Sequence, residues 1–99
     1  MNAVITKEGN TLKIAPVGRL DTVNSSELRE QTDSIGRNGM DIDIDFAEVD
    51  YISSAGLRLL VSFQKDAKAE GHTMVVRNVG KAVAEVFRIS GFNKSLNIV

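Results

Sequence analysis

Two adjacent serines, Ser53 and Ser54, are the residues of this 99-residue chain whose type and position best fit a chemical role. They stand between an alternating segment that predicts a strand and an apolar stretch that predicts a long helix. The first backbone N–H groups of a helix have no partners within it, and the helix dipole makes that end positive. A serine there can cap the helix, act as a nucleophile or accept a phosphoryl group, and the residues alone leave all three roles open.

The nucleophile role is the least supported of the three. A reactive serine needs a base within hydrogen-bond reach, and the G-x-S-x-G pattern of hydrolases is absent because Ile52 and Gly56 stand two residues either side of Ser54. The single histidine, His72, follows the predicted helix and would lie roughly 25 Å from Ser54 at 1.5 Å per residue. We therefore expect no enzyme, and we expect His72 to be a surface turn residue.

Cofactor and metal sites also find little support. The segment Gly80-Lys81-Ala82 lacks the upstream glycine and the following Ser or Thr of a phosphate loop. Asp41, Asp43 and Asp45 alternate along a predicted strand, so their carboxylates would line up about 7 Å apart on one solvated face, too far for one ion. With no cysteine and one histidine, thiolate and His-rich sites are excluded. We expect neither a cofactor nor a metal.

Three aspartates lie near predicted strand ends. Asp21, Asp45 and Asp50 each admit two interpretations. Each can serve a turn or a helix cap, or the three can converge into an acidic rim around Ser54.

Phosphorylation is the remaining chemistry. A phosphoryl group adds about −1.5 to −2 charges and three acceptor oxygens, and the positive end of a helix tolerates that charge. A partner protein with acidic or apolar groups over the same spot would not tolerate it. The modification would then switch binding without refolding the domain, whereas the competing interpretation is that Ser53 or Ser54 is simply a helix cap.

Composition and charge set wider limits. Hydrophobic residues make up 42% and charged residues 25% of the chain, which is typical of one globular domain over residues 1–99. The net charge of −1 argues against a nucleic-acid binder. The polar start, Asn2–Lys7, does not fit a signal peptide, and no apolar run approaches a membrane span. We therefore expect a cytoplasmic protein that binds neither nucleic acid nor membrane, with its oligomeric state left open.

Strand patterns are the clearest in the first half of the chain. The segments 3–8 and 11–17 predict a hairpin around Gly9-Asn10, and 41–46 predicts a strand with Ile42, Ile44 and Phe46 on its buried face. Residues 73–77 predict a further strand, and 96–99 predict a last strand or an extended tail.

Three helices are predicted between these strands. In the first, Asn24 with Glu27 forms a capping box, the helix ends at Gly36, and its inward residues are Leu28, Thr32 and Ile35. The third covers 81–90 before Gly91, with Ala82, Val83, Val86 and Phe87 inward.

The second helix, 54–70, has an apolar arc of roughly 200°, wider than one contact needs. Either this helix is deeply buried, or Leu59 or Phe63 reaches a partner. The alternation of strands and helices predicts an α/β domain, with a mixed sheet of four to five strands and three helices packed mainly on one face.

Three motifs add a resemblance that covers nearly the whole chain. They are Gly18-Arg19-Leu20-Asp21, then Tyr51-Ile52-Ser53-Ser54-Ala55-Gly56-Leu57, and the segment 83–92 that ends Ile89-Ser90-Gly91-Phe92. On these residues the chain resembles the STAS domain, specifically the small bacterial anti-sigma factor antagonists, also called anti-anti-sigma factors.

The resemblance implies a phosphoprotein that regulates transcription by partner switching. Members of this family bind an anti-sigma factor that is also a serine kinase; the kinase phosphorylates one serine and ejects the antagonist, and a PP2C-type phosphatase resets it. Alignment on Gly56-Leu57 assigns that serine to Ser54, with Ser53 as the second choice, although Ser53 stands where the family usually has aspartate. Asp21 falls on an acidic position beside the phosphosite.

The partner-binding surface expected from this alignment is formed by Asp21, Asp50, Ser53, Ser54, Ala55, Gly56, Arg58 and Leu59. The alternative, motivated by Ser53, is a STAS scaffold or interaction module that is not phosphorylated and serves another signalling assembly.

Overall fold

Four strands form the central sheet of the computed structural model, which describes all 99 residues. Their order is β1-β2-β4-β6, and β1 runs antiparallel to β2 while β2, β4 and β6 are parallel. The elements in chain order are β1 (Ala3–Glu8), β2 (Thr11–Pro16), β3 (Gly18–Leu20), α1 (Thr22–Ile35), β4 (Asp41–Asp45), β5 (Val49–Ile52), α2 (Ser54–Ala69), β6 (Met74–Arg77), α3 (Lys81–Ser90) and the short 3-10 helix η1 (Phe92–Lys94).

The predicted hairpin and the strands predicted over 41–46 and 73–77 are confirmed. Gly9 takes a φ of +57° in the two-residue turn between β1 and β2, as a tight hairpin requires. The C-terminal segment reaches the sheet only through a single parallel bridge between Val76 and Ile98, so it is an extended tail rather than a full strand.

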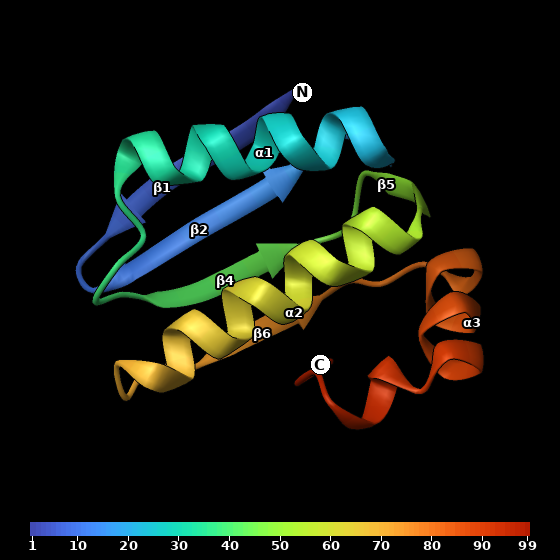
Figure 1. Ribbon diagram of the computed structural model, residues 1–99. Helices are drawn as coiled ribbons and strands as arrows, with labels where there is room; N and C mark the ends of the chain where they lie inside the picture. Colours follow the sequence, from blue (N-terminus) through green and yellow to red (C-terminus); the bar gives the residue numbers. More distant parts are fainter.

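A second, two-stranded sheet positions the two long helices. β3 pairs in parallel with β5, and Leu20 lies opposite Ile52 at their ends. One residue later, Asp21 caps α1, and in the same way Ser53 caps α2. The pairing therefore brings the N-termini of α1 and α2 to the same end of the molecule, near β5 in Figure 1.

Two helices cover one face of the central sheet, while α3 lies at its end. Figure 1 shows α1 and α2 in front of the strands and α3 beside β5, which it contacts. The fold class expected from the sequence, an α/β domain with a mixed sheet and three helices, is confirmed. The opposite sheet face carries polar side chains, among them the ion pair of Arg77 Nε with Asp43 Oδ1 at 2.7 Å.

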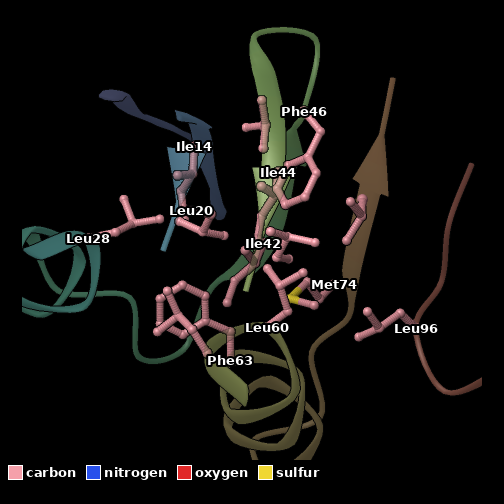
Figure 2. Packing of buried hydrophobic residues seen from close by; sticks show 14 of the residues in the cluster. Ile14, Leu20, Leu28, Ile42, Ile44, Phe46, Leu60, Phe63, Met74 and Leu96 are labelled. Atoms are coloured by element: carbon pink, nitrogen blue, oxygen red, sulfur yellow. The ribbon is translucent and has the colours of Figure 1, made fainter. Parts of the chain in front are cut away.

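One cluster of twenty buried hydrophobic residues fills the space between sheet and helices. In Figure 2, Leu60 and Phe63 of α2 point toward Ile42 of β4, and Leu28 approaches from α1. Leu59 and Phe63 are 3% and 0% exposed, so α2 is deeply buried. The expectation that Leu59 or Phe63 reaches a partner surface is wrong, because the wide apolar arc packs against the chain's own core.

Several local predictions about the helices are corrected. Asp21, not Asn24, caps α1: its carboxylate accepts the N–H of Asn24 at 2.9 Å, and the helix begins three residues earlier than the capping box indicated. Ile35 is 39% exposed near the end of α1, and Ala82 is exposed on α3. By contrast, Gly91 has the left-handed conformation expected after α3.

The fold contains neither a membrane-spanning helix nor a cluster of metal-binding side chains. None of the helices has both the length and the apolar character that crossing a bilayer requires. The structure contains no group of three or more His, Asp or Glu side chains placed to hold a metal ion.

Candidate functional site

Ser53 is the helix cap of the serine pair. Its Oγ accepts the backbone N–H of Gly56 at 3.2 Å and donates to the carbonyl oxygen of Leu20 at 3.2 Å. The backbone N–H of Ser53 donates to the same carbonyl at 3.0 Å. The Ser53 hydroxyl is thus engaged as donor and as acceptor, and its chemistry is that of a cap.

Ser54 has the opposite environment. It is the first residue of α2, it is exposed, and its hydroxyl makes no hydrogen bond within the chain. The first turn of α2 carries no acidic residue, so the positive end of the helix is not neutralised there. Of the two serines, Ser54 alone offers a free hydroxyl at a position that stabilises added negative charge.

A close contact behind the serines fixes the start of α2. A Cβ atom on Gly56 would lie 2.7 Å from the carbonyl oxygen of Leu20 and 2.7 Å from Cγ1 of Ile52. Any side chain at this position would push α2 away from β3 and β5. Gly56 therefore allows the close packing that fixes the start of α2, where Ser54 lies.

Two of the three aspartates near strand ends act as cap and turn residues. Asp21 caps α1, and Asp45 accepts the N–H of Ala47 at 2.9 Å and the Nδ2 of Asn78 at 3.0 Å. These bonds, first that from Asn78 and then that from Ala47, lower the pKa of Asp45 below its ordinary value of 3.8. Asp21 and Asp45 thus have the cap and turn roles, whereas Asp50 is exposed on β5.

The aspartates at 41 and 43 also have local partners. Asp41 accepts the backbone N–H of Thr73 at 3.0 Å and lies 3.2 Å from Nδ1 of His72. These contacts, the Thr73 bond foremost, lower the pKa of Asp41. His72 joins β4 to the segment before β6, and its ring is only partly exposed, so it is more than a surface turn residue.

The other residues of the expected partner surface divide into exposed and buried ones. Arg58 is exposed and Ala55 is half-buried, whereas Gly56 and Leu59 are buried. The side chain of Arg58 is therefore available to a partner, whereas that of Leu59 is buried in the core and is not.

A cation–π contact between Arg19 and Tyr51, two residues before Ser53, was not predicted from the sequence. The guanidinium carbon of Arg19 lies 4.1 Å from the centroid of the Tyr51 ring, and Tyr51 is 40% exposed. The two residues face each other because β3 pairs with β5. Arg19 lies in the motif Gly18-Arg19-Leu20-Asp21, and Tyr51 begins the motif that contains the two serines. Only the strand pairing shows that the two side chains form one stacked surface.

Comparisons with known proteins agree with this architecture. A family model described as "Mlab, STAS domain" matches residues 3–99. The anti-sigma-B factor antagonist of Bacillus subtilis (strain 168) is 24% identical over 98 residues, which cover 99% of this chain and 90% of that protein.

Solved structures show the same fold. An anti-sigma factor antagonist from Mycobacterium paratuberculosis superposes with a TM-score of 0.84 at 17% identity, covering 98% of this chain and 83% of the other. The phosphorylated form of the Bacillus cell fate determinant SpoIIAA gives a TM-score of 0.75 at 18% identity, covering 99% of this chain and 91% of the other.

Proposed function

This chain belongs to the STAS domain family, and on that premise we propose that it is an anti-sigma factor antagonist switched off by phosphorylation of Ser54. Its partner is an anti-sigma factor that is also a serine kinase, and a PP2C-type phosphatase restores the unmodified form. The observation that carries the proposal is the free, exposed hydroxyl of Ser54 at the start of α2.

The chemistry needs nothing from this chain except an accessible oxygen. The Oγ of Ser54 forms a bond to the γ-phosphorus of ATP, the bond from that phosphorus to ADP breaks, and the hydroxyl proton is released. The kinase supplies the ATP and the catalytic groups.

The position explains how binding and folding are separated. The phosphoryl group gains favourable interaction with the positive end of α2, so the fold is retained. A partner seated over Tyr51, Ser54 and Arg58 has to accommodate about two additional negative charges and the volume of the group. Release of the partner then follows from repulsion and lost contact.

Ser53 is the weaker candidate for the same reason that it is a good cap. A phosphoryl group on its Oγ would remove the bond to Leu20 and disturb the one from Gly56. Modification there would loosen the start of α2, whereas modification of Ser54 leaves both bonds in place.

The test is a phosphorylation assay with the anti-sigma factor kinases of the source organism and ATP. Intact-mass and peptide mass spectrometry should find one phosphoryl group, on Ser54, and Ser54→Ala should abolish it. Ser53→Thr, which keeps a hydroxyl cap, and Ser34→Ala, on the exposed surface of α1, should be phosphorylated like the parent chain. Phosphate found only on other residues would refute the assignment.

A second function is favoured by one observation, the serine at position 53 where the family usually has aspartate. In this reading the domain binds its partner constitutively as an interaction module of another signalling assembly. The two functions differ in one measurement: ATP dissociates the complex in the first and leaves it intact in the second.

A further inference from the structure

An open cavity with a volume of about 270 Å³ lies between the first halves of α1 and α2. Three hydroxyl residues of α1, Thr22, Ser25 and Ser26, line it on one side, and Ala55 lines it at the start of α2. The wall is completed by Leu59 and by one arginine from each helix, Arg29 and Arg58. Donors therefore dominate this cavity, and no carboxylate lines it.

The two arginines have no carboxylate partner within 4.0 Å. Three other arginines of the chain do: Arg37 pairs with Asp33 and Asp66, Arg77 with Asp43, and Arg88 with Glu85. The guanidinium of Arg29 lies 5.8 Å from the centroid of the Phe63 ring, a residue of α2, and this contact does not neutralise its charge. Two uncompensated cations on one cavity favour an anionic ligand.

Ser25 supplies a second, independent indication. Ser25 lines the cavity and is only 5% exposed. Its Oγ is buried and has no hydrogen-bond partner. A buried hydroxyl left unpaired costs about 1–3 kcal/mol, so native structures rarely leave one without a reason. An anionic oxygen in the cavity would give this hydroxyl an acceptor.

We propose that this cavity holds a phosphoryl group, namely the one carried by phosphorylated Ser54, with Arg58 and Arg29 as its cationic partners. The inference rests on the proposed function, because it takes Ser54 to be phosphorylated. Ser54 and Arg58 are separated by one helical turn, a spacing that places their side chains side by side. Ala55, the residue after Ser54, is itself part of the cavity wall.

The chemistry of the arginine side chain suits this ligand. Its planar guanidinium donates two parallel hydrogen bonds to phosphoryl oxygens, which a neutral side chain cannot do. The carboxylate of Asp21, which precedes α1, accepts the N–H of Asn24. If Arg58 binds the phosphoryl group, it no longer faces a partner. Phosphorylation then changes the partner surface in two ways: it adds negative charge, and it makes the positive charge of Arg58 unavailable.

The experiment installs phosphoserine at position 54 during protein synthesis, so that no kinase is involved. Phosphorus NMR then follows the second ionisation of the group with pH; the ordinary pKa is about 6. Two neighbouring guanidinium groups should lower this pKa by about 1 unit, since opposite charges favour the dianion. Arg58→Gln and Arg29→Gln should each raise it back toward 6, whereas Arg88→Gln, on α3, should leave it where it is.

The helix N-terminus is present in every variant, so the differences report the arginines alone. Equal pKa values in the parent, Arg58→Gln and Arg29→Gln proteins would overturn the proposal. Because no kinase is used, this result would leave the proposed function standing. Conversely, failure of every kinase to modify Ser54 would leave the NMR result intact.

A second arm separates the attached group from a free one. The unmodified chain is titrated with inorganic phosphate, and the amide shifts of Thr22, Ser26 and Ala55 are followed. These shifts should occur in the unmodified chain and be suppressed in the phosphoserine chain, whose own group fills the cavity. Equal shifts in the two chains would assign the cavity to an external phosphate and overturn the proposal.

Discussion

Ser53 donates twice to the carbonyl oxygen of Leu20, from its backbone N–H at 3.0 Å and from its Oγ at 3.2 Å. The two residues are 33 positions apart, so these bonds tie the end of β3 to the start of α2. Because the same Oγ accepts the N–H of Gly56, one side chain fixes both the sheet connection and the helix cap. The free hydroxyl of Ser54 owes its position to this arrangement.

Ser53→Ala should lower the free energy of unfolding by about 1–2 kcal/mol, the usual cost of a lost helix cap. Urea unfolding measures the change, and Ser53→Thr should recover most of it because threonine keeps the hydroxyl. Ser54→Ala should stay within about 0.5 kcal/mol of the parent, as expected for an exposed side chain without partners. Equal losses at positions 53 and 54 would contradict the assignment of Ser53 as the cap.

Gly56→Ala should destabilise the fold through a direct clash. The new Cβ would lie 2.7 Å from both the Leu20 carbonyl oxygen and Ile52 Cγ1, and overpacking of this kind costs about 1–3 kcal/mol. Gly80→Ala is the matched control, because Gly80 also has a negative φ, of −72°, and a Cβ there meets nothing within 4 Å. Thermal unfolding of the two variants should show the larger loss at position 56.

The sequence predicted the regular elements better than the connections between them. Strict alternation located β1, β2 and β4, since a strand buried on one face must alternate. β3 and β5 were missed because three and four residues are too few for a period to emerge. Their pairing joins residues 31 or 32 positions apart, and this pairing sets the start of α1 and the contact of Arg19 with Tyr51.

The candidate site was partly predictable for a related reason. A serine pair before an apolar helix indicates the start of that helix, so the place of Ser53 and Ser54 followed from local chemistry. Which of the two would cap depended on the Leu20 carbonyl, and the cation-lined cavity depended on Arg29 of the other helix. Both the choice of cap and the cavity depend on contacts between segments far apart in the sequence, which no local sequence pattern predicts.

Arg37 is a residue whose importance only the structure reveals. It lies in the loop after α1 yet is 8% exposed, its Nε is 3.0 Å from Asp33, its Nη1 is 2.7 Å from Asp66, and its guanidinium stacks 4.5 Å from the Phe63 centroid. Arg37→Ala should lower the free energy of unfolding by about 1–3 kcal/mol, because it removes a buried side chain together with its ion pairs to two half-exposed carboxylates.

The comparison that isolates the geometry is Arg37→Lys, measured by the same urea titration. Lysine keeps the charge but cannot stack on Phe63 and bond two carboxylates at once, so it should recover little of the loss. Arg88→Ala, which removes an exposed pair with Glu85, should cost no more than about 1 kcal/mol. Full rescue by lysine would show that the charge alone matters.

Acid should destabilise the protein partly through Asp45. Its pKa in the folded state lies below the ordinary 3.8, so the stabilisation is fully present above that value and is lost as the pH falls through the folded pKa. Asp45→Asn keeps an oxygen acceptor for Asn78 and Ala47 but does not titrate. Its free energy of unfolding should therefore drop less than that of the parent between pH 7 and pH 3, measured by urea titration; an equal drop would exclude this role.

Ser54→Asp should weaken binding of the anti-sigma factor while leaving the fold intact. A carboxylate on the first residue of α2 interacts favourably with the helix dipole, so its free energy of unfolding should match or slightly exceed that of the parent. Calorimetry with the purified anti-sigma factor should show at least about a tenfold loss of affinity, equivalent to about 1.4 kcal/mol.

Ser54→Ala should bind within about twofold of the parent, since removing one exposed hydroxyl typically changes a free energy by less than about 0.5 kcal/mol. Ser34→Asp, near the far end of α1, tests net charge, and it should bind like the parent because Ser34 is distant from the start of α2. The phosphoserine-54 chain is measured in the same series, so that an imperfect charge mimic does not decide the result. Undiminished affinity in both the aspartate and the phosphoserine proteins would rule out a switch at Ser54, and an equal loss in Ser34→Asp would assign the effect to overall charge.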